Sequence, residues 1–197
     1  MKYPPEHHQD HNKLHMIEVL KNYPLATLIS VKNNEPFITH LPLVFREDDK
    51  LIGHIDKFNA HAELLKDNNP ITIIFSGPDC YISPSIYTTK QLPTYNYIKV
   101  HLKGTVVAIK SKEALKDSLI KMTEFLEQTE HNYVLDANNP SMERNLDYIK
   151  MFEITITSWE GKFKLSQDKK KVDIDKAKAE LVRANKQDIT SFLEKIL

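Results

Sequence analysis

Three runs of β-branched and aliphatic residues follow one another closely after Pro24, and only short polar clusters separate them. The runs cover residues 25–31, 36–45 and 51–55, and the clusters read KNNE and REDDK. Such runs are typical of strands, and such clusters are typical of tight turns. Connections this short join neighbouring strands only in the antiparallel sense. The sequence therefore predicts an antiparallel meander in this part of the chain.

The rest of the chain predicts more strands and several helices. Strand patterns occupy residues 71–77, 80–83, 94–109 and 152–159, with a bend expected at Gly104. Helical patterns cover residues 10–22, a short stretch at 59–66, a strong one from residue 111 and the tail beyond residue 173. Mostly sequential strands with inserted and appended helices predict a small β-barrel of the α+β class, with peripheral and C-terminal helices.

Composition sets the broad class. A chain of 197 residues suits one domain with a small helical appendage. Its 27 basic and 27 acidic residues argue against a surface devoted wholly to nucleic acid. The sequence has one cysteine, Cys80, and neither an apolar signal core nor a run of about 18 apolar residues. We therefore expect a cytoplasmic protein without a membrane anchor.

Familiar catalytic and phosphate-binding motifs are missing from the sequence. The four glycines are scattered, so neither a P-loop nor a dinucleotide fingerprint is present, and a bound nucleotide or flavin would be held by side chains. The cluster His7, His8, His11 and His15 suggests either a metal site or a solvated helix start, and the second interpretation is favoured. We predict no metal site and no catalytic side chain.

Four sequence blocks, by their order and spacing, resemble the PaiB family of FMN-binding negative transcriptional regulators. The blocks are Thr39–Pro42, Gly53–His61, the run GP-x-x-YISPS-x-Y…PTYNY-x-x-VH-x-x-G from Gly77 to Gly104, and Gly161–Gln167. The resemblance implies a split β-barrel of the flavin-reductase and pyridoxamine-phosphate-oxidase type, with residues 1–170 as the FMN-binding domain and 171–197 as a helical extension packed on it. It also implies a homodimer with FMN near the subunit interface.

The candidate cofactor-binding residues follow from the resemblance and from the chemistry of FMN. Lys57, Asn59 and His61 are expected at the phosphate, and Thr39 and His40 at the ribityl chain or ring. The remaining candidates are Tyr81, Ser83 and Ser85 on one face of a strand, Tyr95 and Asn96 at the ring, and Lys164, Ser166 and Gln167, which would close the site from the partner subunit. Alternatively, Thr39 and His40 form a hydrogen-bonded core pair, and the tyrosines pack a dimer interface.

Three positions depart from the family pattern: Tyr95 replaces a usual Trp, Met151 a usual Gly and Asp168 a usual Asn. The Tyr keeps an aromatic face for stacking. The aspartate adds a negative charge, which would oppose a phosphate placed beside it.

Three functions remain open from the sequence. The first is a negative regulator of genes for degradative enzymes and sporulation, whose FMN biases an interaction with DNA or a regulatory protein. The second is an FMN-dependent oxidoreductase, in which the flavin does the chemistry and the protein orients it. The third is a dimeric module that has lost FMN. The lack of an acid–base constellation favours a protein that is not an enzyme.

Overall fold

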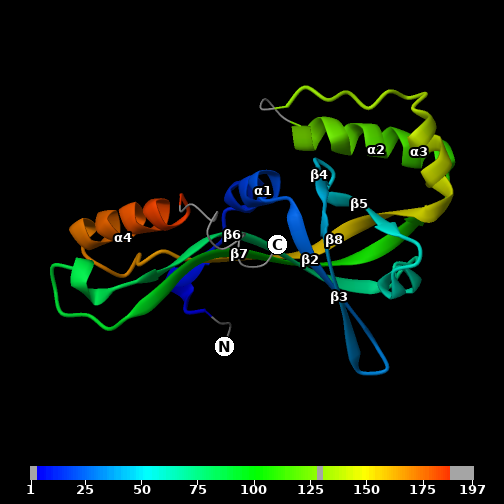
Figure 1. Ribbon diagram of the computed structural model, residues 1–197. Helices are drawn as coiled ribbons and strands as arrows, with labels where there is room; N and C mark the ends of the chain where they lie inside the picture. Colours follow the sequence, from blue (N-terminus) through cyan, green and yellow to red (C-terminus); the bar gives the residue numbers. More distant parts are fainter. Residues whose placement is uncertain (1–3, 128–130, 187–197) are drawn as a thin grey trace, which may run out of the picture.

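One antiparallel sheet organises the protein, shown by a computed structural model that describes residues 4–127 and 131–186. In these residues the sheet has eight strands. Seven follow the order β3-β2-β6-β7-β8-β5-β4, and the eighth, β1, pairs with β8 (Figure 1). The strands are β1 (Gln9–Asp10), β2 (Leu25–Lys32), β3 (Glu35–Pro42), β4 (Val44–Arg46), β5 (Lys50–Asp56), β6 (Pro70–Ile82), β7 (Thr94–Ile109) and β8 (Ile149–Lys164). β3 and β5 contact each other without pairing, so the sheet curls but stays open. The predicted α+β split barrel is confirmed.

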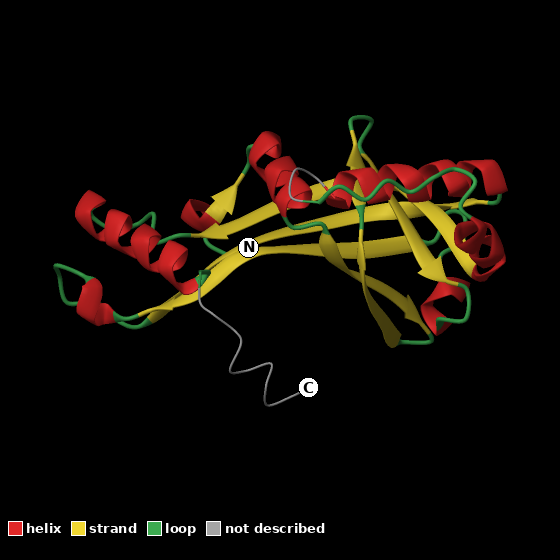
Figure 2. Cartoon of the chain, turned by 45° about the horizontal axis from the view of Figure 1, so that its top comes forward, coloured by secondary structure: helices red, strands yellow, loops and turns green. Residues whose placement is uncertain are grey.

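Helices lie mostly on one side of the long strands (Figure 2). The α-helices are α1 (Lys13–Asn22), α2 (Lys112–Glu127), α3 (Pro140–Asn145) and α4 (Lys171–Ala184), and the 3-10 turns are η1 (Glu6–His8), η2 (Ala60–Glu63), η3 (Pro84–Ile86) and η4 (Leu146–Tyr148). Figure 1 shows the α-helices α1, α2 and α4 above the long strands.

The core follows directly from the strand register. Leu28 on β2 pairs with Ile73 on β6, which pairs with Leu102 on β7, and all three side chains are buried. Because side chains alternate across a strand, this alignment collects every second residue into one apolar layer. Leu20 of α1 packs into the same layer. The periodicity that predicted the strands thus also forms the core.

Several local predictions needed correction. The two strands predicted at residues 71–77 and 80–83 are one strand, β6, with an irregularity between Ser76 and Asp79 that absorbs Gly77 and Pro78. The helix predicted from residue 10 begins at Lys13 with Asn12 as its cap. The helix predicted over 59–66 is only the 3-10 turn η2, although its predicted cap, Asn59, is confirmed.

The far end of the β6–β7 pair forms an extension that we call the arm, comprising residues 79–97. Figure 1 shows the arm projecting to the left of the barrel with α4 above it. Ala177 and Leu181 of α4 pack against Cys80, Ile82 and Tyr87 of the arm. Asp173, buried in the first turn of α4, accepts hydrogen bonds from the Thr88 backbone and hydroxyl at 2.7 and 2.9 Å. Residues 187–197 of the predicted C-terminal extension lie outside the described residues.

The uncovered side of the sheet carries apolar and aromatic side chains, and we call it the open face. Strand alternation places opposite the core the residues Leu25, Thr27, Ile29, Ile38, His40, Ile74, Tyr81, Tyr95 and His101. Leu25 and Ile38 are 63% and 57% exposed, and Tyr81 and Tyr95 are 52% and 51% exposed. Exposed apolar side chains gathered on one face commonly mark an interaction surface.

Candidate functional site

The turn after β5 forms the first part of the candidate site, and we call residues 57–61 the cradle. Asn59 shapes it, because its side-chain oxygen accepts a hydrogen bond from the His61 backbone at 2.9 Å. Its carbonyl accepts another from Ala62 at 2.8 Å. The cap thereby occupies the His61 amide, which is then not available to a phosphate. Side chains, rather than helix-end amides, therefore define this part of the site.

His61 lies at the centre of the cradle and is 1% exposed. Its Nδ1 bonds to the Thr39 hydroxyl at 3.0 Å, so two candidates predicted from separate sequence blocks meet. Its Nε2 is buried and has no partner among the described residues. Burial lowers the pKa of His61, which favours the neutral ring. When the Thr39 hydroxyl donates to Nδ1, Nε2 carries the proton and is free to donate to a ligand.

A second unpaired polar atom lies near the first. The buried Ser30 hydroxyl also has no partner among the described residues. Ser30 pairs in the sheet with Phe37, whose ring centre is 6.3 Å from that of His61. Buried polar groups nearly always find a hydrogen-bond partner, and leaving one without costs about 1–3 kcal/mol. Two such atoms at one end of the barrel fit a polar ligand whose oxygens pair with them.

Two lysines connect the cradle region with the segment around the start of β8. Lys57 is exposed, but its ammonium donates to the Asp147 carbonyl and lies 5.1 Å from the centre of the Tyr148 ring. Lys150 donates to the Ala62 carbonyl at 2.6 Å. The sequence reasoning missed Lys150, although a lysine inside the apolar run that begins β8 was a usable signal. Both lysines hold positive charge beside the cradle while fixing its backbone.

His40 lies on the other side of β3 from Thr39. Adjacent strand residues point to opposite faces, so the two do not form the core pair considered as an alternative. The His40 ring bonds to the Thr27 hydroxyl at 3.0 Å on the open face. His40 is therefore placed to contact whatever covers that face.

The predicted candidates near the end of β8 form a network on the arm. The Tyr87 hydroxyl bonds to Ser166 Oγ at 2.9 Å, and Ser166 Oγ donates to Asn96 Oδ1 at 3.2 Å. Asn96 and Ser166 are both buried. Ser166 does not continue the strand alternation of Lys164, because β8 ends at Lys164 and Ser166 has a φ of 63°. The left-handed backbone turns its side chain inward, into the network.

The side chain of Gln167 is also engaged in hydrogen bonds within the protein. Its Oε1 accepts hydrogen bonds from the Leu165 backbone at 2.7 Å and the His8 ring at 3.1 Å. The neighbouring Asp168 pairs with Lys169 at 2.7 Å, which offsets the negative charge that this position adds. These contacts tie the N-terminal segment to the end of β8.

Two tyrosines of the arm, Tyr81 and Tyr95, face outward. Tyr81 and Tyr95 are directly opposite each other on β6 and β7, and the Tyr95 hydroxyl donates to Asp79 at 3.2 Å. The expected continuation of this strand to Ser85 is wrong. β6 ends at Ile82, and the Ser83 hydroxyl caps η3 while bonding to the Ser85 hydroxyl at 2.8 Å.

The predicted site residues thus form two separate groups within one chain. Leu28 of β2 pairs with Thr39 on one side and with Ile73 of β6 on the other, so Thr39 and Ile73 lie at the same height in the sheet. Tyr81 lies eight residues further along β6. At about 3.3 Å per residue, this places the cradle end and the arm roughly 25 Å apart. Within one protomer, the two groups cannot contact the same part of one small ligand.

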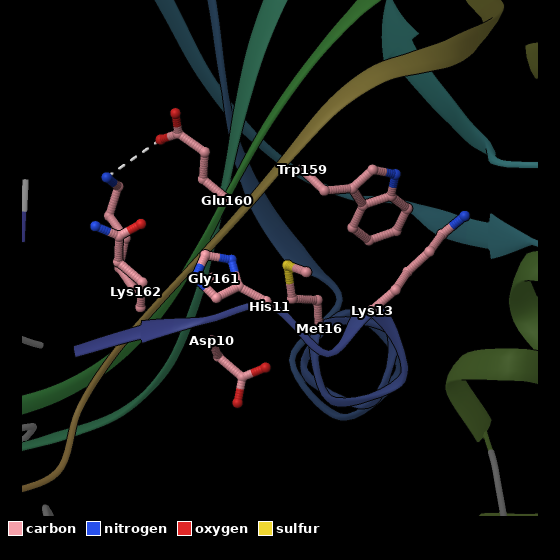
Figure 3. Close-up of a pocket in the computed structure, with 9 residues that line it drawn as sticks. Asp10, His11, Lys13, Met16, Trp159, Glu160, Gly161 and Lys162 are labelled. Carbon is pink, nitrogen blue, oxygen red and sulfur yellow. Dashed lines mark ion pairs between the residues drawn. The ribbon is translucent and has the colours of Figure 1, made fainter. Parts of the chain in front are cut away.

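A cavity of about 310 Å³ lies elsewhere, where β1 and α1 meet β8 (Figure 3). Trp159 and Met16 contribute apolar surface, and Lys13 lies 5.1 Å from the Trp159 ring. Its charges are already matched: Lys13 pairs with Asp49 at 2.5 Å, and Lys162 with Glu160 at 3.2 Å. Its lining residues include none of those predicted to bind FMN.

The fold first defines a class. The chain superimposes on the FAD- and haem-binding protein from Mycobacterium smegmatis with a TM-score of 0.64, 16% identity, and coverage of 86% of this chain and 80% of that chain. The flavocytochrome Anf3 from Azotobacter vinelandii gives a TM-score of 0.59 at 19% identity, over 79% and 69% of the two chains. These superpositions establish the split-barrel fold, and at such low sequence identity they establish the fold alone.

Sequence comparison then gives the family. A family model described as "Putative FMN-binding domain" matches residues 2–158, and the chain belongs to this PaiB-like FMN-binding family, whose cofactor is FMN. Protease synthase and sporulation protein PAI 2 of Bacillus subtilis (strain 168) is 29% identical over 87% of this chain and 84% of its own length. The uncharacterized protein YKL070W of Saccharomyces cerevisiae is 31% identical over 70% of this chain and 95% of its own.

Within residues 4–127 and 131–186, each helix is too short or too polar to cross a bilayer.

Proposed function

We propose that the protein is an FMN-binding homodimer that acts as a negative transcriptional regulator, with each flavin held between the cradle of one protomer and the open face and arm of its partner. The observation that carries the flavin site is His61 Nε2, a buried ring nitrogen without a partner among the described residues. The separation of the two candidate groups supports the dimer, since a second copy can bring an arm to a cradle. The exposed tyrosines of the arm suit such an interface.

The side chains have distinct parts in this proposal. The neutral His61 ring donates from Nε2 to a phosphate or ribityl oxygen, with Thr39 fixing its tautomer. Lys57 and Lys150 keep positive charge beside the phosphate and hold the turn in place. The open face and arm of the partner subunit contribute His40, Tyr81 and Tyr95, which cover the flavin ring and exclude water. Bound FMN supplies reversible electron and hydride transfer, so its redox state is available as a signal.

The regulatory role rests on likeness to the Bacillus protein, whose name refers to protease synthesis and sporulation. We infer corresponding target genes, for degradative enzymes and sporulation, and a cytoplasmic location. A chain with no net formal charge would bind DNA through a local basic patch or through a partner protein. A flavin oxidoreductase is the second candidate, because the fold is shared with the flavocytochrome.

Flavin titration tests the site. We expect His61→Leu to weaken FMN binding roughly 10- to 100-fold, the usual effect of losing one hydrogen bond to a charged group. His54→Gln is a matched control, because His54 is a partly buried histidine that bonds to α2 and not to the cradle. Equal affinities of the wild type and His61→Leu would place the flavin elsewhere. Absence of any flavin binding by the wild type would remove the flavin proposal altogether.

Separate measurements address assembly and role. Ile38→Arg should convert the dimer to a monomer in sedimentation analysis, and a wild-type monomer would contradict the assembly. Binding of promoter DNA with a salt-dependent affinity would support the regulator. Bleaching of the flavin by NADH at catalytic rates, without DNA binding, would favour the oxidoreductase.

A further inference from the structure

A second cavity, of about 380 Å³, lies between α2 and the β4–β5 pair, outside the barrel. Figure 1 shows α2 running above β4 and β5. Its residues are separate from the cradle, the arm and the open face, so a ligand here is independent of the proposed flavin site. Cavities of this size accommodate small organic molecules when apolar walls combine with a few polar groups.

The walls of this cavity are apolar and adaptable. Val44 and Ile52 are paired across β4 and β5, so their side chains are neighbours on the cavity floor. Met122 of α2 and Met151 of β8 are 8% and 7% exposed and line the same space. Methionine side chains are flexible and polarizable, so two of them form a wall that adjusts to the shape of an apolar guest. The walls therefore favour a flexible hydrocarbon over a sugar or nucleotide.

Arg46 lines this cavity, and its two acidic partners are distant. Arg46 approaches Asp48 at 3.6 Å and Glu153 at 3.8 Å, and both distances exceed that of a hydrogen bond. Glu153 is engaged mainly by Lys50, at 2.8 Å. The Arg46 guanidinium is half-exposed and therefore retains donors for a further acceptor. A guanidinium fork matches a carboxylate in a bidentate geometry.

A polar group also lies within the cavity wall. The buried Ser118 hydroxyl of α2 bonds to His54 Nε2 at 2.9 Å. A hydroxyl has one donor and two acceptor positions, so this bond leaves hydrogen-bonding capacity on Ser118. The other cation at the cavity, Lys121, is paired with Asp117 at 2.7 Å. Arg46 is thus the better anchor for an anion.

We infer that this cavity binds a small carboxylate with a flexible apolar chain, such as a medium-chain fatty acid. The carboxylate pairs with Arg46 at the mouth, and the chain lies between Val44 and Ile52 on one side and Met122 and Met151 on the other. Burial of each methylene group favours binding. The bidentate contact between the Arg46 guanidinium and the carboxylate makes the acid bind more tightly than an uncharged chain of the same length.

Methyl-labelled methionine provides the test. The full-length protein with 13C-methyl methionine is titrated with octanoate, and 1-octanol serves as the uncharged chain of matched length. We expect octanoate to shift the methyl signals of Met122 and Met151, while the signal of Met16, which lies between the barrel core and the separate cavity at β1, stays in place. Octanoate should bind at least roughly tenfold tighter than octanol, the effect of one charge-assisted contact.

Variants of the anchor complete the test. Arg46→Gln should weaken octanoate binding roughly tenfold and leave octanol binding unchanged, and Arg46→Lys should restore part of the difference. Ala114→Leu, which fills space on the α2 side, should weaken both ligands. The inference is overturned if millimolar octanoate leaves Met122 and Met151 unshifted, if octanol binds equally well, or if Arg46→Gln binds octanoate like the wild type.

Discussion

His54 gives a prediction whose magnitude follows from the structure. Its side chain lies between β5 and α2, with Nε2 bonded to Ser118, and burial lowers its pKa from 6.5 to about 4. Between these values the unfolded chain binds a proton and the folded chain does not. Protonation of His54 therefore favours the unfolded chain. The folded state keeps its full stability above pH 6.5 and loses part of it as the pH falls towards 4. A difference of about 2.5 pH units corresponds to about 3 kcal/mol of unfolding free energy.

The comparison of wild type with His54→Gln isolates this contribution. Urea unfolding is measured from pH 7.5 to 4.5 at one protein concentration, because assembly also affects apparent stability. Carboxylates and other histidines act alike in both proteins, so they cancel in the difference. We expect the wild type to lose stability relative to His54→Gln by up to about 1.4 kcal/mol per pH unit below pH 6. Parallel pH profiles would refute the buried, neutral state of His54.

Three further outcomes can be measured with the same protein. Gly104→Ala should cost about 1–3 kcal/mol in urea unfolding, because a Cβ there would lie 2.6 Å from the Thr155 carbonyl, whereas Gly77→Ala, with 3.2 Å to its nearest neighbour, should cost less. Asp173→Asn should speed hydrogen exchange of α4 amides roughly tenfold, since it weakens the bonds to the arm, and unchanged exchange would contradict that role. Lys150→Gln should weaken FMN binding severalfold with the fold intact, and equal affinity would show that this lysine does not support the cradle.

The strands were largely predictable because alternation reflects burial on one face. The pattern over residues 94–109 gave both ends of β7, and its expected irregularity lies at Gly104. The division of β6 was wrong because Gly77 and Pro78 resemble a loop when seen without their partner strand. In the structure they lie within the irregularity, where the register shifts and the strand continues. Such an accommodation depends on pairing between distant segments, which local sequence does not encode.

The candidate site was predictable by residue type but not by arrangement. The resemblance selected Thr39 and His61, yet their contact spans two strands and a turn, and only the folded chain brings them together. Ser166 lies beyond the end of β8 and has a left-handed backbone, so strand alternation does not predict the direction of its side chain. The contact of Lys150 with the cradle depends on the pairing of β5 and β8, which are far apart in sequence.

The unpaired atoms of the cradle connect folding with function. A histidine placed in a barrel core solely for packing would be expected to satisfy both ring nitrogens, as buried polar groups generally do. Among the described residues, His61 satisfies only Nδ1, and the hydroxyl of Ser30, which pairs with Phe37 in the sheet, has no partner. The free energy lost in burying these atoms returns when a ligand supplies the missing partners, so it becomes part of the affinity. If the flavin binds at the proposed site, the same atoms that weaken the isolated barrel favour the flavin-bound state.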